Sequence, residues 1–104
     1  MSVTETPVIA SALLTNEVGL HARPAVKLTM LAKSFAATVE LALEQDGPWV
    51  DAKSPVKIMR VKAPKGTLLH FRASGSDADA AVAALVGLVA RGFDENGGED
   101  ADDA

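Results

Sequence analysis

The spacing of hydrophobic and polar residues changes several times along this chain, and each change predicts a new element. Residues 8–14 form a short apolar run that is typical of a buried strand. From Ala22 to Phe35 the apolar residues recur every three or four positions, which predicts an amphipathic helix. Residues 37–43 then alternate between apolar and polar, as in a half-buried strand. The pattern therefore predicts strand, helix and strand for this part of the chain.

Turn residues divide the next part of the chain into two further elements. A turn at residues 45–48 is followed by extended residues 49–51, and the two predict a hairpin with the preceding strand. Ser54 and Pro55 then open a short helix, because serine is a favoured N-cap and proline a favoured first helical residue. We expect this helix to end before the Pro-Lys-Gly sequence at residues 64–66.

The last two predicted elements are a strand and a helix. Residues 67–73 alternate, so we expect Leu69, Phe71 and Ala73 to point inward. A helix follows, with Ser76 as the expected N-cap and its end near Gly92. The complete order is β-α-β-β-α-β-α, which predicts an α+β fold with the helices on one face of a sheet.

Charge is distributed unevenly along the 104 residues, which are few enough for a single domain. The net charge is −4, but residues 1–93 contain eight acids and ten bases, a net charge of +2. We therefore expect a folded domain over residues 1–94 and an acidic disordered tail over residues 95–104. The basic excess is too small for a nucleic-acid groove.

Several classes of site and location are disfavoured by composition. The chain contains no cysteine, which excludes disulfides and thiolate metal sites. It has no apolar run long enough for a membrane helix and no signal peptide, so we expect a cytoplasmic protein. No cluster of metal ligands accompanies either histidine and no Gly-rich nucleotide loop is present, so we expect no cofactor. His70 is expected to be a strand residue that faces solvent or a helix edge.

His21 carries the chemistry that this sequence indicates most clearly. It lies at the expected N-cap of the first helix, where the backbone amides of Ala22 and Arg23 have no intrahelical partner. Helix N-termini bind phosphate and disfavour imidazolium, so we expect a neutral, nucleophilic ring. Arg23 adds a permanent cation suited to phosphate oxygens, and Gly19 allows a tight turn before the site. Together these residues favour transient phosphorylation of His21; the plain alternative is an ordinary residue at a helix start.

The two helices that follow His21 and Ser54 also carry a predicted docking face for acidic partners. Exposed apolar side chains next to Lys and Arg form a small, adaptable contact surface. The residues expected on this face are Val26, Lys27, Met30, Val56, Lys57, Met59 and Arg60.

The segment Gly19-Leu20-His21-Ala22-Arg23-Pro24-Ala25 resembles the active-site motif of HPr, the histidine-containing phosphocarrier of the bacterial sugar phosphotransferase system. Residues 50–54, 65–67 and 92–93 also resemble that family. The resemblance implies an open-faced sandwich with a four-stranded antiparallel sheet and three helices on one face.

The resemblance further implies a carrier rather than an enzyme, acting as a monomer. His21 would accept a phosphoryl group from enzyme I and pass it to a IIA-type sugar phosphotransferase domain, and Arg23 would stabilise the phosphate. Ser54 matches the family's regulatory serine, the target of a kinase in some bacteria, but it equally fits a plain N-cap. Pro55 departs from the large apolar residue that the family more often has there.

Two alternatives to the sugar phosphocarrier stay open. One is a regulatory HPr-like binding module, or a nitrogen-related phosphotransferase paralogue, that acts through protein contacts without sugar uptake. The other is a small hydrolase that uses His21 as a base, although the sequence contains no evident nucleophile for it.

Overall fold

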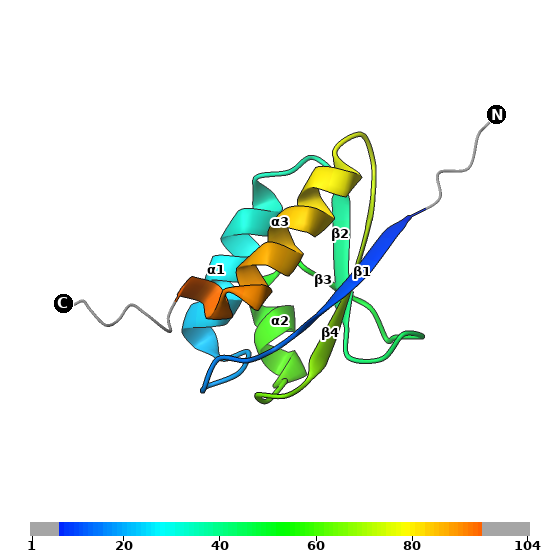
Figure 1. Cartoon of the computed structure of the whole chain (residues 1–104). Coiled ribbons are helices and arrows are strands. Elements are labelled where there is room, and N and C mark those ends of the chain that lie inside the picture. The colour runs from blue at the N-terminus through cyan, green and yellow to red at the C-terminus, as the bar shows by residue number, and fades with distance from the viewer. Residues whose placement is uncertain (1–6, 95–104) are drawn as a thin grey trace.

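A computed structural model describes residues 7–94 of the chain (Figure 1). The predicted acidic tail, residues 95–104, lies outside this range. The elements are β1 (Val8–Leu13), α1 (Ala22–Lys33), β2 (Thr38–Ala42), β3 (Val50–Asp51), α2 (Pro55–Val61), β4 (Leu68–Ser74), α3 (Ala78–Ala90) and the short 3-10 helix η1 (Gly92–Asp94). Their order confirms the predicted β-α-β-β-α-β-α sequence.

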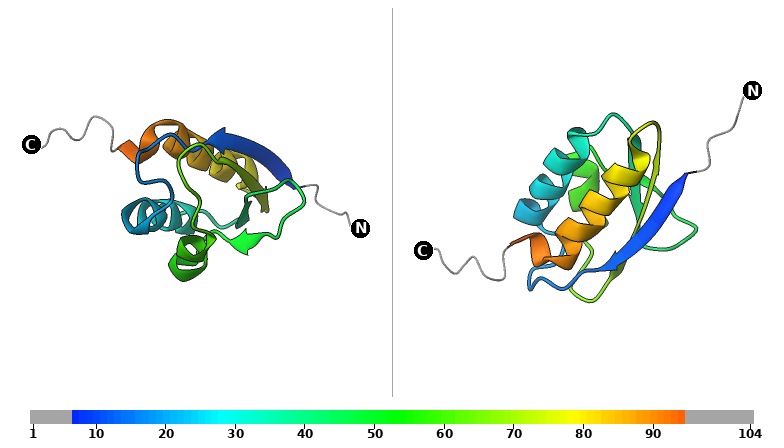
Figure 2. Two further views of the ribbon diagram at one scale, coloured as in Figure 1. Left: turned by 90° about the horizontal axis from the view of Figure 1, so that it is seen from below. Right: turned by 45° about the horizontal axis from the view of Figure 1, so that its top comes forward.

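The four strands form one antiparallel sheet in the order β1-β4-β2-β3. Strand β4 is central, and its Ala73 pairs with Val8 on one side and with Val39 on the other. All three α-helices cover one face of the sheet and leave the other face without helices (Figure 2). This arrangement confirms the α+β open-faced sandwich. Within residues 7–94, no helix has the length and apolar character needed to cross a membrane.

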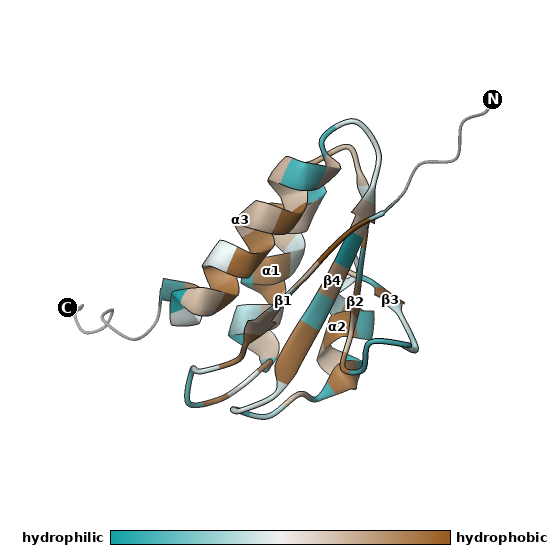
Figure 3. Cartoon of the chain, turned by 45° about the vertical axis from the view of Figure 1, so that its right-hand side comes forward, coloured by the Kyte–Doolittle hydropathy of each residue, from teal (hydrophilic) through white to brown (hydrophobic). Residues whose placement is uncertain are grey.

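The core lies between the sheet and the helices, and the alternation in β4 shows why. Leu69, Phe71 and Ala73 are buried, as predicted, while the residues between them face the other side. Figure 3 shows the resulting alternation of hydrophobic and hydrophilic bands along this strand. The helices contribute Leu28 and Leu85, both fully buried, to the same core.

Helix α1 ends at Lys33 rather than at the predicted Phe35. The backbone amide of Ser34 donates to the carbonyl of Leu31 (3.0 Å), and that of Phe35 donates to Ala32 (3.2 Å). These hydrogen bonds reach back three residues instead of four, so the last turn tightens and the helix stops.

The N-cap of α3 is Asp77, so the prediction of Ser76 was wrong. The Asp77 carboxylate does not cap its own helix. It accepts hydrogen bonds from the backbone amides of Ala36 (2.9 Å) and Ala37 (2.8 Å), which directly precede β2. These amides, Ala36 first, hold the pKa of Asp77 below its ordinary value. The side chain therefore joins two loops that are about forty residues apart in sequence.

The prediction that His70 faces solvent or a helix edge was also wrong. This residue lies on the helix-free face of β4, yet it is buried, with 8% of its surface exposed. It lines a hollow together with Gln45 and Trp49 of the loop between β2 and β3. That loop covers the imidazole, which strand alternation alone could not reveal.

Candidate functional site

His21 occupies the N-cap of α1, as the sequence predicts. Its backbone is extended (φ −99°, ψ −169°), and its carbonyl accepts the first helical hydrogen bond from the amide of Ala25 (2.8 Å). The imidazole is exposed, and its Nδ1 accepts a hydrogen bond from the backbone N–H of Ala22 (2.8 Å). Nδ1 therefore carries a lone pair that points at the helix N-terminus, and Nε2 is the protonated nitrogen of the neutral ring.

The first turn of α1 offers backbone donors to an anion. Two amides, those of Ala22 and Arg23, precede the first helical hydrogen bond and can point toward a ligand. Pro24 has no N–H, so it adds none. The Arg23 side chain is exposed beside them, and α1 contains no acidic residue. The helix start is consequently positive, with an exposed nucleophile on it.

The loop before His21 is held against the segment that follows α2. The backbone amide of Leu20 donates to the carbonyl of Ala63 (2.8 Å). Gly19 adopts a φ of +69°, and a Cβ there would lie 2.5 Å from the same carbonyl oxygen. Only glycine satisfies both the backbone angle and the close approach. The glycine that the sequence places before the site is thus required by its packing.

Asn16 supports the same loop, and the sequence indicated only a turn residue there. Its side chain is buried, and Nδ2 donates to the carbonyl of Gly19 (2.8 Å). Next to it, Lys65 forms an exposed ion pair with Glu17 (2.9 Å), and this lysine holds the pKa of the Glu17 carboxyl below its ordinary value. The asparagine in a turn signal was the one available hint of this support.

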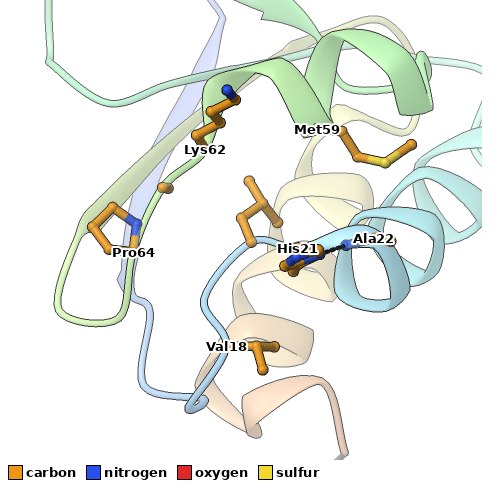
Figure 4. Close-up of a pocket in the computed structure, with 8 residues that line it drawn as sticks. Val18, His21, Ala22, Met59, Lys62 and Pro64 are labelled. Carbon is orange, nitrogen blue, oxygen red and sulfur yellow. Dashed lines mark hydrogen bonds between the residues drawn. The ribbon is translucent and has the colours of Figure 1, made fainter.

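Shallow hollows lie on two sides of His21. On one side, Met59 of α2 and Val18, Lys62 and Pro64 line a hollow of about 420 Å³ together with His21 (Figure 4). Arg23 and Pro24 line the other. Lys62, which the sequence did not single out, ends α2 in a left-handed conformation (φ 56°) and lines the same hollow, with its ammonium group pointing away from His21 in Figure 4.

The predicted docking face is exposed on α1 and α2, which pack side by side. Its most exposed apolar residues are Met30, at 67%, and Val56, at 54%, and the side chains of Val26, Met59, Lys57 and Arg60 are also exposed. Lys27 differs, because it is half-buried and its Nζ donates to the carbonyl of Phe93 (2.8 Å). Lys27 is thus less exposed than the other residues of this face, and its part in docking stays a prediction.

Ser54 occupies the N-cap of α2, as predicted. Its Oγ accepts a hydrogen bond from the backbone amide of Lys57 (3.3 Å), and Pro55 takes the first helical position. The plain N-cap role therefore accounts for this serine structurally, and its phosphorylation stays a prediction.

Comparisons with known proteins agree with this geometry. A family model described as the PTS HPr component phosphorylation site matches residues 10–91. Phosphocarrier protein NPr of Escherichia coli K12 is 36% identical over 83 residues, which cover 80% of this chain and 91% of that protein. Phosphocarrier protein HPr of Cupriavidus necator is 38% identical over 82 residues, which cover 79% and 90%.

A solved structure with the same fold is HPr-C-His from Thermoanaerobacter tengcongensis. It superimposes with a TM-score of 0.78 at 32% sequence identity, and the match covers 86% of this chain and 98% of that chain. The likeness confirms the predicted sandwich independently of the strand register.

Proposed function

The chain belongs to the HPr family of phosphocarrier proteins, and on that premise we propose that His21 accepts a phosphoryl group on Nδ1 and passes it to a partner protein. The observation that carries the proposal is the hydrogen bond from the Ala22 amide to Nδ1 (2.8 Å). A ring nitrogen that accepts a hydrogen bond is unprotonated, so its lone pair can attack phosphorus once the Ala22 amide turns to the incoming phosphoryl oxygen. During transfer the phosphorus–nitrogen or phosphorus–oxygen bond of the donor breaks as the Nδ1–phosphorus bond forms. The exposed Nε2 can release its proton to water.

The first turn of α1 stabilises the negative charge of a phosphoryl group on His21. A phosphoryl group on Nδ1 would take over the Ala22 amide as a donor to one of its oxygens, with the Arg23 amide next to it. The Arg23 guanidinium is close enough in sequence to add a charge-assisted bond. The site stays open to solvent, so the group remains accessible to the next protein.

The partners we propose are enzyme I as donor and a IIA-type sugar phosphotransferase domain as acceptor, with the chain acting as a monomer. Exposed Met30 and Val56, with Lys57 and Arg60 nearby, suit a small, transient contact with an acidic surface. Relatives named HPr and NPr match at similar identity, so a nitrogen-related IIA domain belongs in the same assay as a sugar-related one.

Phosphorylation of the full chain tests the acceptor directly. Incubation with enzyme I and phosphoenolpyruvate is expected to add about 80 Da, the mass of one phosphoryl group, in an acid-labile form. His21→Ala should abolish the adduct. His70→Gln is the matched control, because it removes the other histidine of the chain. Equal phosphorylation of His21→Ala and the unmodified protein would refute the proposal.

Two substitutions test the groups around Nδ1. Ala22→Pro removes the amide donor at the first helical position, where proline is tolerated and the extended backbone of His21 suits a following proline. Loss of one bond to a charged group costs about 1.5–3 kcal/mol, so we expect transfer to slow by about 10- to 150-fold with the fold intact. Arg23→Ala should also slow transfer, whereas Lys33→Ala, at the other end of α1, should not.

A serine kinase acting on Ser54 is part of the proposal. Phosphate at the N-cap of α2 would place negative charge beside Lys57 and weaken docking of an acidic partner. Ser54→Asp should therefore slow transfer from enzyme I. Ser54→Ala should leave transfer intact and cost about 1 kcal/mol of stability through loss of the cap.

A regulatory binding module is the second candidate, favoured by the exposed apolar side chains of Val26 and Met30. Such a module would bind its target with equal affinity whether His21 is phosphorylated or not. Affinity measurements with both forms separate the two functions, since a carrier must release its acceptor partner after transfer.

A further inference from the structure

Several of the described basic residues form ion pairs with carboxylates. Lys65, Arg72 and Arg91 each form an ion pair. Within residues 7–94, by contrast, four exposed bases on or next to the site helices form no ion pair. We call this set the basic face; its members are Arg23, Lys57, Arg60 and Lys62. No acidic residue occurs in α1 or α2, so neither helix provides a counter-charge of its own.

Glu40 and Asp51 line one hollow with Lys57 and Arg60 but form no ion pair with them, and a larger group of carboxylates follows the described residues. Residues 95–104, which we call the acidic segment, contain no base and carry five carboxylates, namely Glu95, Glu99, Asp100, Asp102 and Asp103. Residues 7–94 end at Asp94, so the position of that residue decides what the acidic segment can reach.

The structure fixes the end of η1 beside the first half of α1. Phe93 is fully buried, and its carbonyl accepts a hydrogen bond from Lys27 Nζ (2.8 Å). Arg91 Nε donates to the Asp94 carboxylate (2.8 Å), which holds the last described residue in place. Figures 1 and 2 show η1 next to the start of α1, in agreement with the contacts between these two elements. The acidic segment therefore begins near the candidate site.

The distances involved are short compared with the length of the acidic segment. Six residues separate His21 from Lys27, which is about 9 Å along a helix axis. Ten extended residues span up to about 33 Å. Carboxylates from Glu99 onward can consequently reach Arg23. The bases of α2 lie one helix farther, since α2 packs beside α1 and packed helix axes are about 8–10 Å apart, which is also within this span. A short tether gives a millimolar effective concentration.

We propose that the acidic segment binds the basic face and competes there with the acidic surface of a partner protein. Single exposed ion pairs are weak, and salt screens them, so the contact is displaced easily and lowers partner affinity without blocking it. The contact itself is independent of phosphorylation, whereas its effect on phosphoryl transfer rests on the proposed function of His21.

A nitroxide spin label at Ala104→Cys tests the contact, because the chain has no other cysteine. We expect stronger broadening of the amide signals of residues 22–23, 25–27 and 56–62 in this chain than in the same chain with Asp100→Asn, Asp102→Asn and Asp103→Asn. Salt at about 0.5 M, where charges are screened within a few ångströms, should remove the difference. Because a segment without affinity would broaden both chains equally, equal broadening would overturn the proposal.

Competition with the partner is tested by the kinetics of phosphorylation by enzyme I. The triple substitution should lower KM for the carrier about two- to tenfold and leave kcat unchanged, since it frees a partly occupied surface. Glu44→Gln, Asp46→Asn and Asp79→Asn together are the matched control, with the same change in net charge at exposed residues outside the site helices. An equal fall in KM for this control would overturn the competition. If spin-label broadening supports the contact but no variant accepts phosphate, the function of His21 fails and the contact stands.

Discussion

Gly19→Ala is the most informative single change in the loop that positions His21. An added Cβ would lie 2.5 Å from the carbonyl oxygen of Ala63 and 3.0 Å from the backbone nitrogen of Lys65. The Ala63 carbonyl already accepts the Leu20 amide (2.8 Å), so it cannot move away without weakening that bond. The alanine would also have to adopt a φ of +69°.

The expected loss has two parts. A left-handed backbone costs a non-glycine residue about 1–2 kcal/mol, and overpacking costs about 1–3 kcal/mol. Gly66→Ala is the matched control, because Gly66 also has a positive φ (+95°) but nothing lies within 4 Å of its added Cβ. Both alanines restrict the unfolded chain by the same amount, which cancels in the comparison. Gly19→Ala should therefore lose about 1–3 kcal/mol more than Gly66→Ala.

Urea unfolding followed by circular dichroism measures both free energies of unfolding. In a domain of this size each kcal/mol also lowers Tm by about 4–8 °C, so thermal melts provide a second readout. We further expect slower phosphorylation of His21 in Gly19→Ala under conditions where the protein stays folded. Equal losses of stability in the two glycine variants would refute the role of the Ala63 contact.

Three other predictions concern the core, the surface and the acid sensitivity of the fold. Leu85→Ala should lower the free energy of unfolding by about 2–5 kcal/mol, since Leu85 is fully buried, and a urea titration with a smaller loss would contradict this packing. Met30→Ala should leave Tm nearly unchanged but weaken binding to enzyme I in titration calorimetry, and unchanged affinity would remove Met30 from the docking face. Asp77→Asn should destabilise the fold near neutral pH, because the amides of Ala36 and Ala37 hold the pKa of this carboxyl below its value in the unfolded chain. The contribution of Asp77 is complete above about pH 4, the pKa of an unfolded aspartate, and is lost as pH falls through the lower folded pKa. The difference between Asp77→Asn and the unmodified protein should accordingly shrink in acid, and urea unfolding at a series of pH values that shows a constant difference would refute it.

The sequence alone determined the features of this protein that depend on neighbours in the chain. Apolar spacing predicted three helices and four strands, and the inward alternation of Leu69, Phe71 and Ala73 was correct. The N-cap positions of His21 and Ser54 could also be predicted, because a cap is recognised from its own residue and the few that follow it.

Tertiary structure decided the features that depend on contacts between distant segments. Asp77 accepts hydrogen bonds from amides about forty residues away, Lys27 donates to the carbonyl of Phe93, and Lys62 lines the same hollow as His21. Periodicity and capping preferences depend on only a few successive residues, so they cannot predict contacts between segments that are distant in the sequence. The helix start that makes His21 a candidate acceptor is local and readable in the sequence, whereas its surroundings exist only once β1, α2 and η1 have packed around α1.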